Sequence, residues 1–421
     1  MLLALGMFLA TYALLLFLPK IRAYIALVSA ACFVLLGILP RQNVFFAVDW
    51  NVLMMIAGTM GIVYLFIESK MPAKMADYII EKTPNVQWAI VALSLFASIV
   101  SAFMDNVATV LMIAPVALTI AKKLKISPVP SIIAISVSSN LQGAATLVGD
   151  TTSILLGGYA GMDFLDFFFF HGRIGMFFVV QAGALAAALL LLFLFRKQKQ
   201  PVHIAKKTEV EDRFPTYLLL GTVMLLIIAS FIPGKPVTIN GSICMSMMGI
   251  GILREIIHTK DVKAFVRVLK EIDVFTLLLL GSLFIVVESI REAGVVDQIA
   301  GFIISISNNN LFLIYTLLVW ASVLLSAFID NIPYVATMLP MTSGIAKMLN
   351  VDPTILYFGL LAGATLGGNL TPIGASANIT ALGILRKEGH EVSTKVFMKI
   401  SVPFTLAAVL TGYILIWLIW R

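Results

Sequence analysis

The sequence predicts an all-α polytopic membrane protein with two inverted repeats, each of five spans and one re-entrant hairpin, and with broken helices at the bilayer midplane. Of its 421 residues, 60% are apolar and 12% are charged, whereas soluble domains contain about 25% charged residues. Apolar runs of about twenty residues, long enough to cross a bilayer, recur along the chain. One stretch of the first half also recurs in the second. These observations exclude most soluble enzymes and nucleic-acid-binding proteins.

Eight apolar segments are predicted to be simple spanning helices, because each has the length that a bilayer core requires. The first of them lacks a basic amino-terminal flank and a clear cleavage site, so it is interpreted as a retained span. The eight segments lie at about residues 2–18, 23–39, 51–67, 174–195, 215–232, 237–253, 273–290 and 400–420.

Four further segments do not fit this template. Residues 89–121 and 310–346 are too short for two spans and too long for one, and each has an Asp-Asn pair near its middle. We therefore predict a re-entrant hairpin in each, with two half-length arms that meet at the polar pair. Residues 129–157 and 354–385 are also overlong, and their centres, rich in Gly, Ser, Thr and Asn, predict helices broken at the midplane.

Lysine and arginine residues are concentrated in alternate connections, and this asymmetry predicts the orientation. The chain has 29 basic and 22 acidic residues, a net charge of +7. The positive-inside rule places the basic connections in the cytoplasm and both termini outside, in a multi-pass protein of the plasma or inner membrane. The first inverted repeat is predicted at 1–195, a cytoplasmic linker at 196–214 and the second inverted repeat at 215–421. The spans outside the hairpins and broken helices would permit a homodimer within the lipid bilayer.

An internal repeat supports the division into two halves. Shifting the chain by 225 residues aligns 101–153 with 326–378 without a gap, and 16 of the 53 aligned positions are identical. Chance similarity between apolar helices would give Leu and Ala identities, whereas polar residues and glycines recur here, so a duplication is predicted. Because each half crosses the bilayer an odd number of times, the second half is inverted, as in secondary transporters. The recurring residues of the first half include Ser101, Ala102, Phe103, Asp105, Asn106, Pro115, Gly143, Thr146 and Gly149.

Four motifs within this repeat resemble a known group of membrane proteins. They are SAFMDNVATVLMIAP, SNLQGAATLVGDTTSIL, SAFIDNIPYVATMLP and GATLGGNLTPIGASANI. At these residues the sequence resembles the ion transporter superfamily, above all the branch with arsenite permeases, NhaD-type sodium/proton antiporters and the melanosomal P protein. The divalent anion/sodium symporters are more distantly similar. The resemblance implies an elevator-like movement of hairpins and broken helices, in a superfamily whose members move anions, metalloid species or cations.

The candidate ligand residues lie at the two hairpin tips and the two helix breaks, where half-helix N-termini favour anionic groups and carboxylates suit a small cation. A charged side chain in hydrocarbon costs about 2.5 to 3.5 kcal/mol, which favours a function for the tip aspartates, although capping a helix alone would also explain them. The repeat partner of Asp150 is Ala375, so the site is predicted to be asymmetric in charge, with a proton or cation site at the aspartate. For the other candidates, hydrogen bonds to helix carbonyls and close helix packing are structural alternatives. The candidates are Asp105, Asn106, Asn140, Gly143, Thr146, Asp150, Thr151, Ser153, Asp330, Asn331, Asn369, Thr371, Ser376 and Asn378.

The leading hypothesis is a secondary active transporter of a small inorganic or organic anion, coupled to Na⁺ or H⁺ at Asp105, Asp150 or Asp330. A Na⁺/H⁺ antiporter using the same aspartates, and an efflux permease for arsenite or another metalloid, are the alternatives. Neither Cys32 nor Cys244 lies in the proposed site, so no thiolate or other structural metal site is predicted. We expect no enzymatic activity, no nucleic-acid partner and no cofactor beyond the coupling ion.

Overall fold

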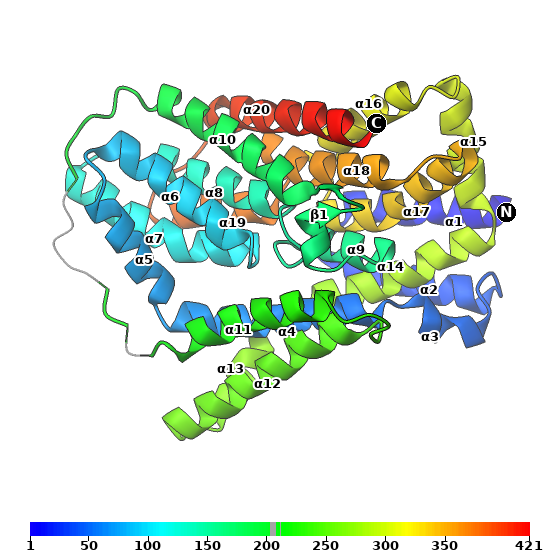
Figure 1. Ribbon diagram of the computed structural model, residues 1–421, viewed down its shortest axis with the longest axis horizontal. Coiled ribbons are helices and arrows are strands. Elements are labelled where there is room, and N and C mark those ends of the chain that lie inside the picture. Colours follow the sequence, from blue (N-terminus) through cyan, green and yellow to red (C-terminus); the bar gives the residue numbers. More distant parts are fainter. Residues whose placement is uncertain (203–207, 211) are drawn as a thin grey trace.

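The computed structural model describes residues 1–202, 208–210 and 212–421, and it is almost entirely helical (Figure 1). Within these residues the only strands are β1 (Phe169–Phe170) and β2 (Arg173–Ile174), an antiparallel pair in which Phe169 is opposite Ile174. The all-α polytopic fold class is therefore confirmed. Both ends of the chain lie at the same end of the molecule (Figure 1).

The first half contains ten α-helices, several of which are shorter than a full span. Most of the interruptions fall where the sequence has proline, glycine or an Asp-Asn pair. In chain order the helices are α1 (Leu2–Phe17), α2 (Arg22–Leu35), α3 (Val44–Ala47), α4 (Trp50–Glu68), α5 (Met71–Glu81), α6 (Val86–Ser101), α7 (Asn106–Leu124), α8 (Val129–Gln142), α9 (Thr151–Ala160) and α10 (Met176–Leu194), with 3-10 turns η1 (Pro19–Ile21), η2 (Arg41–Asn43) and η3 (Leu165–Phe167).

The second half repeats this order of elements. Helices α6, α7 and α8 begin and end 225 residues before α16, α17 and α18, which is the shift found in the sequence. In chain order the helices are α11 (Phe214–Ser230), α12 (Ile239–Thr259), α13 (Lys263–Glu271), α14 (Val274–Glu292), α15 (Val295–Ile306), α16 (Leu311–Ser326), α17 (Asn331–Leu349), α18 (Thr354–Gly367), α19 (Ser376–Lys387) and α20 (Thr394–Trp420), with the 3-10 turn η4 (Gly368–Leu370).

The contacts between the two halves occur in matching pairs, in which each helix and its counterpart contact equivalent helices of the other half. Helix α4 packs against α12, and its counterpart α14 packs against α2. Likewise α19 contacts α7, and α9 contacts α17, while α10 and α20 pack against each other. A two-fold relation between the halves gives this pattern. The inversion of the halves relative to the bilayer, and the count of five spans in each, stay predictions.

Helix lengths differ from the predicted spans in two places. Segments 2–18 and 23–39 were predicted as separate straight spans, but α1 and α2 have 16 and 14 residues and are bent by 109° at the break between them. At 1.5 Å per residue they are about 24 and 21 Å long, shorter than a bilayer core of about 30 Å. The reason is Pro19, since proline ends a helix and restricts the preceding residue. By contrast α7, predicted as a half-length arm, has 19 residues and the composition of a full span.

Four short segments interrupt the helices near the centre of the molecule, and they position the candidate site. The first tip is residues 102–105 between α6 and α7, and the second tip is 327–330 between α16 and α17. The first break is 143–150 between α8 and α9, and the second break is 368–375 between α18 and α19. The predicted centres of residues 89–121, 129–157, 310–346 and 354–385 contain these four segments.

Candidate functional site

A cavity of about 320 Å³ lies at the first tip and the first break, against the first residues of α17 and α19, which follow the second tip and the second break, and we call it the first cavity. Its walls come from α4, α7 and α8, the start of α9, and the starts of α2, α14, α17 and α19. The lining is polar at the tips and breaks and apolar along α4 and α7. Seven of the predicted candidates line it: Asp105, Asn106, Asn140, Asp150, Thr151, Asn331 and Ser376.

Four of the helices that begin at this cavity, α7, α9, α17 and α19, follow a tip or a break, and three of these four are capped by a carboxylate. Asp105 Oδ1 accepts a hydrogen bond from Ala108 N at 3.0 Å. Asp150 Oδ1 accepts from Thr151 N at 2.8 Å, and Asp330 Oδ1 accepts from Ile332 N at 3.0 Å. Capping, the alternative reading of these aspartates, is therefore part of their role.

Helix α19 differs from the other three, because its N-cap is Ala375, which has no side-chain acceptor. The first N–H groups of a helix have no partner within the helix, and the helix dipole adds positive potential there. Ser376 and Ala377, the first residues of α19, both line the first cavity. The asymmetry predicted from Asp150 and Ala375 corresponds to a difference in capping. Of the four helices that follow a tip or a break, α19 alone has no side-chain cap.

Asp150 also joins the two halves. Its Oδ2 accepts from Thr152 Oγ1 at 3.2 Å and from Asn331 Nδ2 at 3.4 Å. Asn106, at the start of α7, donates through Nδ2 to Asn140 Oδ1 at 3.1 Å. The polar side chains of the site are therefore held by one another rather than projecting freely.

The other seven predicted candidates do not line the cavity. Two of them, Thr146 and Thr371, are repeat partners whose hydroxyls donate to the carbonyls of Ala102 and Ala327, which are also repeat partners. Each threonine thus fixes a break against the tip of its own half, a structural role. The remaining five are Gly143, Ser153, Asp330, Asn369 and Asn378.

The glycines of the breaks are explained by close backbone approach. A Cβ added to Gly149 would lie 3.0 Å from the carbonyl oxygen of Gly143, and one added to Gly374 would lie 2.6 Å from that of Gly368. These glycines let each break fold back on itself and on its tip. Gly143 itself packs against the Asp150 side chain, so a larger residue there would displace a residue of the site.

Hydrogen bonds also cross between the two breaks and the helices that precede them. Asn140 Nδ2 donates to the carbonyl of Thr365 at 2.8 Å, and Asn369 Nδ2 donates to that of Val137 at 2.8 Å. Ser136 Oγ donates to Asn378 Oδ1 at 2.7 Å. Side chains with two buried partners in different halves tie the breaks into one unit, since breaking such bonds in an apolar interior is costly.

The structure adds residues that the sequence did not indicate as ligands. Asp273 caps α14, accepting from Thr276 N at 3.0 Å, and it lines the cavity beside Glu271. The Asp-x-x-Thr spacing at 273–276 was a detectable capping signal. With Asp105 and Asp150 these residues give the cavity four carboxylates, whereas Arg22 is its one basic residue among the described lining. Arg22 is not among the candidates predicted from the sequence.

A second cavity, of about 470 Å³, is built from the equivalent parts of the other half. Met60 and Tyr64 of α4 line the first cavity, and Phe284 and Glu288, 224 residues further on in α14, line the second. Asp273 and Asp49 are related in the same way. None of the predicted candidates is among the described residues that line the second cavity, which is bounded instead by later turns of α9 and α17.

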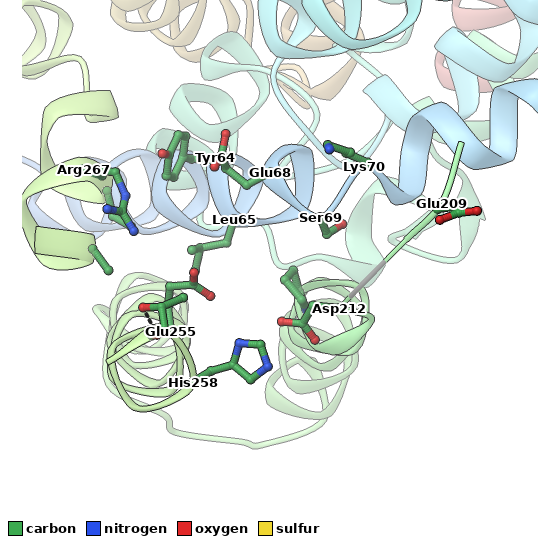
Figure 2. A pocket seen from close by; sticks show the side chains of 14 residues that line it. Tyr64, Leu65, Glu68, Ser69, Lys70, Glu209, Asp212, Glu255, His258 and Arg267 are labelled. Atoms are coloured by element: carbon green, nitrogen blue, oxygen red, sulfur yellow. Dashed lines mark hydrogen bonds between the residues drawn. The ribbon is translucent and has the colours of Figure 1, made fainter. Parts of the chain in front are cut away.

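A third pocket, of about 200 Å³, lies between the end of α4, α12, α13 and the residues before α11 (Figure 2). Figure 2 shows His258 of α12 lying between Glu255 and Asp212. Among the described residues no group of three or more His, Cys, Asp or Glu is arranged to hold a metal ion. This pocket contains no tip or break residue, so it is separate from the candidate site.

A polar cavity at interrupted helices inside an apolar helical protein defines a multi-pass membrane transporter as the class. The chain belongs to the citrate transporter family, CitMHS, whose model matches residues 12–363 and 265–421. This result confirms the resemblance to the ion transporter superfamily that the motifs indicated.

Relatives cover nearly the whole chain. A 46 kDa membrane protein of Mycobacterium leprae is 32% identical over 99% of this chain and 98% of its own length. An uncharacterized transporter of Mycobacterium tuberculosis is 31% identical over the same shares. The human P protein is 27% identical over 87% of this chain and 53% of its own length. The YdaH transporter of Alcanivorax borkumensis, known from a crystal structure, has a TM-score of 0.60 with 14% identity, covering 89% of this chain and 86% of that one, which shows a shared fold.

Proposed function

We propose that the protein is a secondary active transporter that moves a small inorganic or organic anion together with Na⁺ or H⁺. The observation that carries this proposal is the uncapped start of α19 in the first cavity, beside three helix starts whose dipoles are already met by carboxylates. An anionic group placed there completes the set, because helix N-termini favour negative charge. The description of the family, citrate transporter, names an organic anion.

The coupling cation belongs at the carboxylates of the same cavity. Asp105 and Asp150 cap their helices through Oδ1, so each keeps lone pairs for a small cation or a proton. Moving an anion and a cation together through an apolar medium costs less free energy than moving either alone, because their charges neutralise each other. This mutual dependence is the physical basis of the proposed coupling.

An elevator-like movement fits the way that the tips and breaks are held. Hydrogen bonds tie the two breaks together across the halves, and the threonines tie each break to its tip, so these segments are suited to move as one body. The first cavity reaches them from one end of α4, and the second cavity offers an equivalent wall at the other end.

The proposal is tested by thermal stabilisation of the purified protein across a panel of anions, each with Na⁺, with K⁺ and at two pH values. A ligand that binds the native state at a hundred times its Kd adds about 2.7 kcal/mol of stability. We expect a shift in Tm that needs both one anion and either Na⁺ or low pH. A shift with Na⁺ alone, abolished by acid and independent of every anion, would contradict the proposal.

That contrary result would favour a Na⁺/H⁺ antiporter, the second candidate. A specific observation supports it: four carboxylates, Asp105, Asp150, Glu271 and Asp273, line the first cavity against the single arginine. In an antiporter protonation of one aspartate displaces Na⁺, whereas in an anion symporter the anion is needed for full cation affinity. The same panel therefore separates the two.

A further inference from the structure

Arg22 lines the first cavity. It is the first residue of α2, directly after the 3-10 turn that follows the bend between α1 and α2. Its Nη1 donates to Asp330 Oδ2 at 2.5 Å, and the two side chains are 18% and 20% exposed. This ion pair fastens the start of α2 to the second tip, on the wall of the cavity.

The guanidinium of Arg22 is not saturated by this partner. A guanidinium has five N–H donors in a planar fork that suits bidentate contact with carboxylate or phosphate groups. Among the described residues, the Nε of Arg22 is buried and has no hydrogen-bond partner. A buried donor of this kind costs free energy until an acceptor reaches the group.

The corresponding corner at the second cavity contributes no charged side chain to the described lining, and its Lys235 pairs with Asp163 instead. There the corner between α11 and α12 contributes Val237 and Thr238 to the lining. No arginine is paired with the first tip. Asp105, the repeat partner of Asp330, forms no ion pair among the described residues. Arg22 is thus the arginine of the cavity that contains tip and break residues, whereas the second cavity has Arg291 of α14, which lies 3.5 Å from Glu288.

We propose that Arg22 binds the transported anion and that Asp330 is the counter-ion that holds Arg22 while the cavity is empty. This inference rests on the proposed function. Arg22 and the uncapped start of α19 line the same cavity, and together they give a small anion a guanidinium on one wall and free N–H groups on another.

An exchange of partners follows from this arrangement. When an anion takes Arg22, the Asp330 carboxylate is left four-fifths buried without its counter-ion, which is unfavourable in a poorly solvated site. A Na⁺ ion or a proton at Asp330 removes that cost. Asp330 is thereby a position, in addition to Asp105 and Asp150, at which anion binding is linked to a coupling cation.

The test compares purified wild type with Arg22→Gln, Asp330→Asn and the double variant, with Lys20→Gln as the control. Lys20 is exposed, lies two residues before Arg22 and does not line the cavity. The probes are citrate, succinate, sulfate and inorganic phosphate, each titrated at fixed Na⁺ and pH while the Tm is recorded. The double variant leaves neither charge unpaired, so it stays informative if Arg22→Gln fails to fold.

For the probe that shifts the wild type, we expect Arg22→Gln and the double variant to bind about 10 to 100 times more weakly, the loss expected for a charge-assisted pair of hydrogen bonds. Asp330→Asn should bind about ten times more tightly, because the competing carboxylate is gone, and its shift should depend less on Na⁺ or pH than that of the wild type. Lys20→Gln should match the wild type.

Two results would overturn the inference, and they are distinguishable. If a probe shifts the wild type and the double variant at the same concentration, Arg22 does not bind the anion, and the proposed function stands. If no probe shifts the wild type, the proposed function fails in this panel and the role of Arg22 fails with it. Unchanged binding and unchanged cation dependence in Asp330→Asn would remove the exchange step alone.

Discussion

The two large cavities are built from equivalent elements, yet only one of them reaches the tips and breaks. Tyr64 and Asp273 line the first cavity, and their counterparts Glu288 and Asp49 line the second. In the first cavity the opposite wall is made of helix starts and capping carboxylates, whereas in the second it is made of the sides of α9 and α17. The repeated scaffold therefore carries two cavities, and of the two only the first is lined by residues of a tip and a break.

The largest expected effect is a difference between the two breaks in the stability lost when a glycine is replaced by alanine. A Cβ at Gly374 would lie 2.6 Å from the carbonyl oxygen of Gly368, while one at Gly149 would lie no closer than 3.0 Å to any backbone oxygen. Gly374→Ala should therefore destabilise the protein by about 3 kcal/mol and Gly149→Ala by about 1 kcal/mol. The Tm of both variants checks this order. Equal losses would mean that the second break is not the tighter one.

The next effect tests the difference in charge between the breaks. Ala375→Asp makes the second break resemble the first, because the new carboxylate would cap α19 as Asp150 caps α9. The free helix start then no longer attracts an anion, a loss of about 2 kcal/mol or about thirtyfold in affinity. Titration of the anion-dependent shift in Tm measures it.

Ala375→Gly is the matched control for that substitution, because glycine adds no acceptor at the cap. It should retain the anion-dependent shift. If Ala375→Asp binds the anion as the wild type does, the start of α19 is not part of the anion site.

A smaller effect distinguishes the two cavities by chemical labelling. Tyr64 and Glu288 are repeat counterparts in different cavities, so cysteines at these positions should react with an impermeant maleimide from opposite sides of a sealed vesicle. We expect about a tenfold difference in rate between the sides for each variant, since thiol modification follows exposure. Cys32, which is exposed, and Cys244, which is buried, are first replaced. Labelling of both variants from one side would contradict access to the two cavities from opposite sides.

The smallest effect compares the two tips. Tyr12 Oη donates to the carbonyl of Pro333 at 3.0 Å, next to the second tip. Tyr12→Phe removes a hydrogen bond worth about 1 kcal/mol, so hydrogen exchange should quicken around residues 330–336 and stay unchanged around 105–111. Tyr24→Phe is the control, because Tyr24 is 58% exposed. Equal acceleration at both tips would show that α1 does not hold the second tip selectively.

Much of the fold could be predicted from the sequence because its signals are local. Polar pairs inside apolar segments marked the tips, and the 225-residue shift between Asp105 and Asp330 recurs in the bounds of α6 to α8 and α16 to α18. The bend between α1 and α2 was missed because Pro19 stands at a predicted span end, where proline is ordinary. Helix α15 was also missed, because residues 295–306 lie between the predicted span at 273–290 and the predicted hairpin at 310–346.

The candidate site was harder to predict because residue type does not show which atoms already have partners. Thr146 and Thr371 look like ligands in the sequence, but each donates to the carbonyl of a tip. Arg22 looked like a flank of a span, and only its distance to Asp330 reveals it as part of the cavity wall. The threonine contacts join residues 44 positions apart and the arginine contact joins residues 308 positions apart, and hydropathy and spacing encode neither.

The hydrogen bond from Asn140 to the carbonyl of Thr365 has a consequence for how the protein is made. The two residues are 225 positions apart. At synthesis rates of about 5 to 20 residues per second, the amide of Asn140 waits on the order of ten to fifty seconds for its native acceptor. During that time the nascent first half holds the polar side chains of its break in a membrane without the partners that later satisfy them. Its maturation in the bilayer therefore ends only after the carboxyl-terminal half has been inserted.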